Sequence, residues 1–251
     1  MTKLLGSLVL AALSMQANDL FYTTAGVGAE LVAINVHSDN TTTTTLIGPM
    51  NGGVCASLAL SPWGTLYSVC GDLFGTQQLA TIDRATGQSN LFGVAVPGLA
   101  VMAMEFGPGG NLYAVGNLLG SPYNSLYQVD VRTGAFTLIG PTGAPLFFMA
   151  LTIDRDGEIY GVTCDLGTYT DLSTLYRIDR ATGHATKIVD LGNTSIMGLS
   201  FNQEKDKLYV TDFNSANSNL YLVNIRTGSL TPVAAIGYGH SSNLVAVPET
   251  D

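Results

Sequence analysis

Short runs of alternating apolar and polar residues cover most of the chain, and each run ends at a turn. The run LYRIDRATG at 175–183 has near copies at 79–87, 126–134 and 220–228, and a degenerate copy at 31–35. Alternation up to the Asp predicts a strand, and the Thr-Gly after it predicts a tight hairpin. The Asp or Asn anchors lie at 35, 83, 130, 179 and 224, a spacing of 45 to 49 residues. A repeat of this length filled with short strands predicts an all-β, five-bladed propeller with four-stranded blades.

The acidic anchors are predicted to be turn caps. An Asp or Asn at the start of a turn accepts a hydrogen bond from the backbone two residues on, and the Gly that follows takes the positive φ that reverses the chain. Asp83, Asp130 and Asp179 recur with the blades. A catalytic acid is needed once and a hairpin in every blade, so regular recurrence favours the structural role.

Each repeat divides into four predicted strands. The first strands, such as 146–151, are apolar on both faces, which is typical of an innermost strand between neighbouring blades. The predicted strands are 55–60, 66–70, 78–83 and 89–93 in repeat two; 101–106, 112–115, 125–130 and 136–140 in repeat three; 148–153, 159–164, 174–179 and 186–189 in repeat four; and 196–201, 208–212, 219–224 and 230–235 in repeat five.

Two end segments compete to supply the first strand of blade one: 8–13 and 243–247. Residues 1–17 have a Lys, an apolar run and small residues near the end, which is the pattern of a secretory signal peptide. On this preferred interpretation, 18–251 is a single propeller domain, and the C-terminal strand closes the ring beside 20–23. Alternatively, residues 8–22 align without gaps on 196–210, so 1–17 supply the strand themselves. The C-terminal strand is then free to pair with another molecule.

Composition indicates an extracytoplasmic protein. Charged residues make up 12% of the 251 positions, the net charge is −9, and no basic run occurs. These features exclude nucleic acid and anionic membrane surfaces as expected partners. Past the N-terminal segment, no apolar stretch is long enough to span a membrane. Asn40 and Asn193 begin glycosylation sequons, which matter in a host that glycosylates.

The three cysteines lack the spacing of a zinc site, and no metal site is expected. Cys55 and Cys70 flank a turn almost symmetrically, which places them opposite each other on adjacent strands. They form either a disulfide or a pair of reduced core cysteines. Cys164 is interpreted as a small buried apolar residue.

Propeller geometry places the loops between second and third strands on one face, together with the loops that lead to the next blade. The former loops, at 71–77, 116–124, 165–173 and 213–218, are long and varied, and binding residues usually lie on such loops. Their aromatic, amide and carboxylate groups suit a neutral carbohydrate. The candidate ligand-binding residues are Asp72, Asn117, Tyr123, Asn124, Asp165, Tyr169, Asp171, Asp212, Asn214, Asn217 and His240.

The Leu-Tyr-x-Ile/Val-Asp-x-x-Thr-Gly phrase resembles the repeat of quinoprotein-type propellers from residue 19 onward. In the quinone-dependent dehydrogenases of that group, a Trp follows the Gly by four residues and docks neighbouring blades; here Leu91, Leu138, Lys187 and Pro232 stand instead. The resemblance therefore implies the fold and not the cofactor, and no cofactor is expected. The sequence at 244–249 resembles the junction at which exported bacterial propellers meet a Pro-Glu-Pro sorting signal, which implies export.

These observations predict a non-catalytic binding or scaffold propeller, monomeric, with a carbohydrate or protein ligand. One alternative is a self-assembling subunit of an extracellular filament or surface array, in which a free terminal strand completes a neighbour. A second is a glycan hydrolase, for which Asp72, Asp165 and Asp171 would have to supply two converging carboxylates. The sequence contains no Gly-x-Ser-x-Gly nucleophile elbow, no His-Glu-x-x-His metalloprotease motif and no phosphate-loop motif, so no catalytic residue is assigned.

Overall fold

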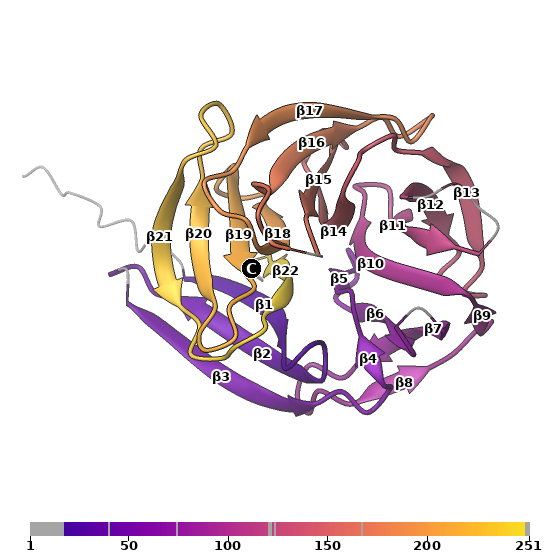
Figure 1. Cartoon of the computed structure of the whole chain (residues 1–251). Helices are drawn as coiled ribbons and strands as arrows, with labels where there is room; N and C mark the ends of the chain where they lie inside the picture. The colour runs from indigo at the N-terminus through magenta and orange to yellow at the C-terminus, as the bar shows by residue number, and fades with distance from the viewer. Residues whose placement is uncertain are drawn as a thin grey trace, which may run out of the picture.

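The computed structural model describes residues 18–39, 41–73, 75–119, 122, 124–166 and 168–248. It arranges five antiparallel sheets around a central axis (Figure 1). The described residues contain strands, turns and loops and no helix. The predicted five-bladed, all-β propeller is confirmed.

In each of the following blades, the four strands are given in order from the innermost, next to the axis, to the outermost. Blade one consists of β22 (Ser242–Val247), β1 (Asp19–Ala25), β2 (Glu30–Val36) and β3 (Thr42–Pro49). Blade three consists of β10 (Leu99–Phe106), β11 (Leu112–Leu118), β12 (Ser125–Val129) and β13 (Phe136–Pro141). Blade four consists of β14 (Phe147–Ile153), β15 (Ile159–Cys164), β16 (Thr174–Ile178) and β17 (Ala185–Asp190), and blade five of β18 (Ile196–Asn202), β19 (Lys207–Asp212), β20 (Asn219–Val223) and β21 (Leu230–Ala235).

Blade two departs from the predicted pattern. Its inner strand is broken into β4 (Val54–Cys55) and β5 (Ala59–Leu60), both paired with β6 (Leu66–Gly71). The outer side of β7 (Thr76–Ile82) pairs with two short strands, β8 (Ser89–Leu91) and β9 (Val96–Pro97). Cys55 and Cys70 lie opposite each other in the register and are joined by a disulfide. The disulfide therefore fastens the short strand β4 to β6.

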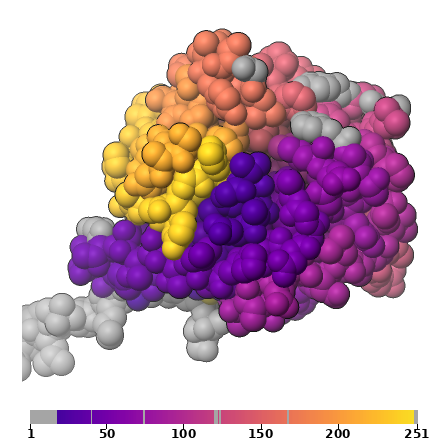
Figure 2. Space-filling model, turned by 60° about the horizontal axis from the view of Figure 1, so that its bottom comes forward, coloured from indigo at the N-terminus to yellow at the C-terminus, as the bar shows by residue number. Residues whose placement is uncertain are grey.

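The C-terminal strand closes the ring, as the sequence predicted. Strand β22 pairs with β1, with Tyr22 opposite Val245 and Thr24 opposite Ser242. The two ends of the described chain thus lie side by side, and the yellow C-terminal surface touches the indigo first strands in Figure 2. The Thr24 hydroxyl donates to the Ser242 carbonyl at 2.6 Å. The competing candidate strand, residues 8–13, and the predicted signal peptide, residues 1–17, lie outside the described residues.

The anchor residues of repeats two to five cap their hairpins as predicted. In blade four, Asp179 Oδ1 accepts the backbone N–H of Ala181 at 3.0 Å, and Gly183 has a φ of 80°. Hydrogen bonds from Thr182 and from the backbone lower the pKa of Asp179. In blade one, Asn35 lies inside β2 opposite Leu20, so the strand continues past the anchor and the turn follows two residues later.

The core consists of apolar clusters between neighbouring blades. One cluster joins blades two and three through Leu79, Leu99 and Met104, which are almost completely buried. Equivalent clusters occupy the other four interfaces between blades. Inner strands such as β10, β14 and β18 are buried on both faces, so they are fixed in position and give the channel a rigid wall.

Candidate functional site

The predicted binding residues on the loop face lie on separate loops, and several of them hold their own loop in place. Asp165 accepts hydrogen bonds from the hydroxyl and backbone N–H of Thr168. Asn214 Oδ1 accepts the N–H of Ala216 at 3.0 Å, and Asn217 Oδ1 accepts the N–H of Gly237 at 2.7 Å. The oxygens of Asp165 and Asn214 therefore stabilise their own loops, and that of Asn217 joins its loop to the loop before β22.

Other candidates on this face differ in exposure. Asp72, Tyr169 and Asp171 are exposed. Asp212 is buried and accepts the backbone N–H of Asn219 at 2.6 Å and the hydroxyl of Tyr221 at 3.0 Å. His240 is half-buried with its ring centroid 4.8 Å from that of Phe213, a residue of the loop after β19. Tyr123 and the sequon residue Asn40 lie outside the described residues, whereas Asn193 is half-buried.

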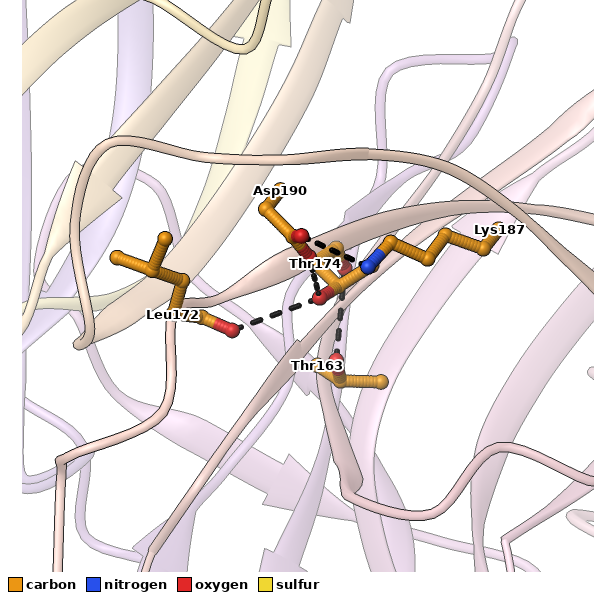
Figure 3. Close-up of polar contacts among 5 residues, drawn as sticks. All are labelled: Thr163, Leu172, Thr174, Lys187 and Asp190. Atoms are coloured by element: carbon orange, nitrogen blue, oxygen red, sulfur yellow. Dashed lines mark hydrogen bonds and ion pairs between the residues drawn. The ribbon is translucent and has the colours of Figure 1, made fainter.

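Below the longest of these loops, a polar network joins the outer strands of blade four (Figure 3). The Thr174 hydroxyl donates to Asp190 Oδ1 at 2.6 Å, and Lys187 Nζ donates to Asp190 Oδ2 at 2.7 Å. Both hydrogen bonds lower the pKa of Asp190, and the bond from Lys187 has the larger effect. The network holds β16 against β17 where the loop that carries Asp165 and Asp171 returns to the sheet.

Asn124 joins blade three to blade four. Its Oδ1 accepts the N–H of Phe148 at 3.2 Å, its Nδ2 donates to the Leu146 carbonyl, and its own N–H donates to Asn117 Oδ1 at 2.6 Å. At the equivalent position of blade four, the Ser173 hydroxyl accepts the N–H of Ile196 at 3.0 Å. Gln77 and Ser218 make the same kind of contact in blades two and five. A polar residue at this position therefore links consecutive blades.

Replacing Asn124 by Ala is expected to lower the free energy of unfolding by about 1–3 kcal/mol, because it leaves the buried Phe148 N–H without its partner. Replacing the exposed Asp171 by Ala is expected to change it by less than about 0.5 kcal/mol. Urea denaturation of the two variants measures both values. An Asn124→Ala protein as stable as the original would show that this side chain does not link the blades.

Methionines fill the loop-face end of the channel. Met102, Met149 and Met197 each occupy the bulge of the inner strand of its blade, where the register with the second strand shifts. The three pack against one another and against buried Cys164. Burial raises the pKa of the Cys164 thiol to about 11. The wall at this end is apolar and holds a protonated thiol.

The opposite end of the channel forms a pocket of about 390 Å³ that is open at the face of the short turns. All five blades contribute to it, whereas the hollow bounded by Arg177 and Glu158 lies within blade four. The apolar wall of the channel pocket includes Phe106, Ile153 and Phe201, near the ends of the inner strands. The other lining residues are Leu60, Ser61, Pro62, Gly64, Arg84, Glu105, Gly107, Pro108, Arg155, Ser200, Gln203, Val245, Ala246, Val247 and Pro248.

Glu105 is the one carboxylate among these lining residues. When the blades are aligned on their inner strands, the residues equivalent to Glu105 are Ala59, Thr152, Ser200 and Ala246. The Thr152 and Ser200 hydroxyls accept N–H groups of the next inner strand at 2.9 and 2.8 Å. Glu105 Oε1 instead accepts the N–H of the adjacent Phe106 at 2.9 Å. Small residues in the other four blades leave space beside its carboxyl group.

Burial raises the pKa of Glu105 to about 8, opposed by the hydrogen bond from Phe106. At neutral pH the group is therefore mostly a carboxylic acid, which can donate one hydrogen bond and accept others. A strongly perturbed acid in a pocket that unites all blades marks a candidate binding site. This site lies at the opposite end of the channel from the predicted loop-face residues.

Sequence reasoning did not select Glu105, although one signal pointed to it. It is the only charged residue within the described inner strands. Arg84 and Arg155 gave no such signal, because each follows an Asp of a turn, where a charged residue is ordinary. Their approach to the channel depends on how the blades are packed around it.

Other chemistry is sparse in the part of the chain that the structure describes. No group of three or more His, Cys, Asp or Glu side chains there is arranged to hold a metal ion. No helix in that part is long and apolar enough to cross a membrane. The residues that line the channel pocket supply hydrogen-bonding groups, two guanidinium groups and apolar surface.

No protein-family model and no curated protein sequence matches the chain. Among solved structures, TolB from Acinetobacter baumannii is similar with a TM-score of 0.55 at 13% identity, covering 94% of this chain and 67% of that one. The periplasmic gluconolactonase PpgL from Pseudomonas aeruginosa has a TM-score of 0.51 at 9% identity, with coverage of 92% and 99%. The PQQ-bound aldose sugar dehydrogenase from Streptomyces coelicolor has a TM-score of 0.50 at 16% identity, with coverage of 77% and 71%. At these identities the similarity shows a shared β-propeller fold.

Proposed function

We propose that this protein is an extracytoplasmic, non-catalytic propeller that binds a small organic molecule in the channel pocket beside Glu105. The observation that carries the proposal is the pocket itself, in which Glu105 stands where the other blades have small residues. A rigid concave site with apolar walls and few polar groups is typical of small-molecule binding. A single acid in the pocket also favours binding over glycoside hydrolysis, which uses two carboxylates.

Two observations support the extracytoplasmic location. The Cys55–Cys70 disulfide would persist in an oxidising compartment. PpgL, which has the same fold, is a periplasmic protein by name. The predicted signal peptide at 1–17 and the sorting junction at 244–249 would take the chain there, and both remain proposals.

The channel pocket is preferred to the loop face as the binding site. On the loop face, several predicted oxygens are already engaged by backbone N–H groups, for example those of Asp212 and Asn217. In the channel pocket, Glu105 Oε1 accepts one such bond. Recognition of a neutral carbohydrate by exposed loop residues, such as Tyr169 and Asp171, remains the second candidate function.

Saturation-transfer NMR with a library of small organic molecules tests the proposal. Replacing Ala246, which lines the pocket, by Met is expected to abolish the transfer signal of bound molecules because the longer side chain fills the space. A matched Ala216→Met variant, on an exposed loop of the opposite face, is expected to keep the signal. Equal signals from both variants would contradict the pocket. Binding of glycans that is lost in Tyr169→Ala would instead support the loop face.

A further inference from the structure

The channel pocket carries positive charge in an acidic protein. The whole chain has a net charge of −9, yet the charged residues that line the pocket are Arg84, Arg155 and Glu105. Because Glu105 is mostly neutral at pH 7, the two guanidinium groups determine the charge of the pocket. A concave site lined by one sign of charge concentrates ligands of the opposite sign.

Arg84 is oriented by contacts that leave its charge uncompensated. Its Nε donates to the Tyr22 hydroxyl at 3.3 Å, its Nη1 donates to the Gly64 carbonyl at 3.2 Å, and its guanidinium lies 5.4 Å from the centre of the Tyr22 ring. All of these partners are neutral. The arrangement holds the guanidinium in place and leaves further N–H donors for an anion.

Arg155 lines the blade-four side of the pocket, is exposed, and also hydrogen-bonds a neutral group. It donates to the backbone carbonyl of Gln203, whose side-chain amide donates to the Ile153 carbonyl at 2.6 Å. The ion pairs of the described residues involve Arg132, Arg177, Lys187 and Lys205, so neither pocket arginine takes part in them. Both pocket arginines therefore keep guanidinium N–H groups that can donate to an anion.

Glu105 and the arginines of the pocket have different hydrogen-bond partners. Glu105 Oε1 accepts the N–H of Phe106 at 2.9 Å, whereas the arginines donate to Tyr22, Gly64 and Gln203. Between these polar groups, the wall is formed by apolar residues such as Phe106, Ile153 and Phe201. The pocket therefore offers cationic groups, an apolar surface and a separate hydrogen-bonding acid.

We propose that the pocket binds a small amphipathic organic anion, a carboxylate or phosphate monoester with an apolar body. The anionic group contacts Arg84 and Arg155, and the apolar body packs on the phenylalanine and isoleucine side chains. This assignment rests on the proposed function, because it names the ligand class of the same pocket. The guanidinium fork matches both carboxylate and phosphate geometry.

Calorimetric titration with three probes that share one apolar body tests the assignment: 4-phenylbutyrate, 4-phenylbutan-1-ol and 4-phenylbutylamine. 4-Phenylbutyrate is expected to bind most tightly. Arg84→Gln and Arg155→Gln are each expected to weaken its binding by about ten-fold or more, the usual effect of losing a charge-assisted hydrogen bond. Arg132→Gln changes the net charge equally at an exposed site outside the pocket and is expected to have little effect.

The outcomes separate the ligand class from the proposed function. If the alcohol or the amine binds as tightly as the carboxylate, the ligand is not specifically an anion and this assignment is overturned. If Ala246→Met abolishes that binding, the pocket is still a binding site. Carboxylate binding that is unchanged by both arginine substitutions would also overturn the anion assignment. Absence of binding by all three probes overturns the anion assignment, and the library screen then decides the pocket by itself. 4-Phenylbutyl phosphate in the same titration shows which anionic group is preferred.

Discussion

Replacing Glu105 by Gln is expected to stabilise the protein above neutral pH and to leave its stability nearly unchanged near pH 4. The folded protein holds the pKa of Glu105 at about 8, against an ordinary value of 4.5. Between these values the unfolded chain releases the proton and the folded protein keeps it. The free energy of unfolding of the original protein therefore falls as the pH rises from 4.5 to 8, and the contribution is constant above pH 8.

The shift in the pKa of Glu105 sets an upper limit on the gain in the free energy of unfolding that Glu105→Gln produces. Each unit corresponds to about 1.4 kcal/mol. Because the carboxyl group borders an open pocket and is only partly shielded, we expect a smaller gain than the full shift implies, on the order of 2 kcal/mol at pH 8. The amide of Gln keeps the shape and the hydrogen-bonding capacity of the side chain and does not titrate.

Urea denaturation from pH 4 to pH 9 measures the difference between the two proteins. Glu158→Gln is the matched control, because Glu158 is exposed and forms a surface ion pair with Arg177 at 3.6 Å. Its effect is expected to stay below about 1 kcal/mol without a gap that widens toward pH 8. A constant difference between Glu105→Gln and the original protein across this range would show that Glu105 titrates normally.

Removing the Cys55–Cys70 disulfide is expected to cost about 3 kcal/mol, the value typical of a crosslink closing a loop of this length. The two cysteines are 15 residues apart, and both are fully buried. The local structure strengthens the expectation, because β4 is a two-residue strand held to β6 by two residue pairs. For a chain of this size, the melting temperature should fall by roughly 6–12 °C.

Two forms of the experiment separate the crosslink from the loss of side-chain volume. Reduction of the original protein breaks the bond without changing any side chain, whereas the Cys55→Ala/Cys70→Ala variant also removes two buried sulfurs. Cys164→Ala provides a control for the volume, since Cys164 is buried and not bonded to another cysteine. If full reduction, verified by counting three reactive thiols after unfolding, leaves the melting temperature unchanged, the disulfide contributes nothing to stability.

The sequence by itself determined the features that depend on local hydrogen bonding and periodicity. The LYxIDxxTG phrase specified a strand and its hairpin, and Asp179 caps its turn as the spacing predicted. The apolar runs before each turn specified inner strands, and the run at 243–247 was the preferred of two end segments that could close the ring; the structure pairs it with β1. Even the facing cysteines followed from their spacing about a turn. Each of these follows from a few neighbouring residues and the period of a strand.

Only the tertiary structure revealed what the channel contains. The strand break in blade two between β4 and β5, the role of Asn124 as a link between blades, and the pocket beside Glu105 all depend on contacts between residues far apart in the chain. In an inner strand, alternation does not distinguish a side chain facing a neighbouring blade from one facing the channel, because both environments are buried. Glu105 becomes a candidate site only when the small residues of four other blades are placed around it, since the space beside a side chain is a property of the packed ring.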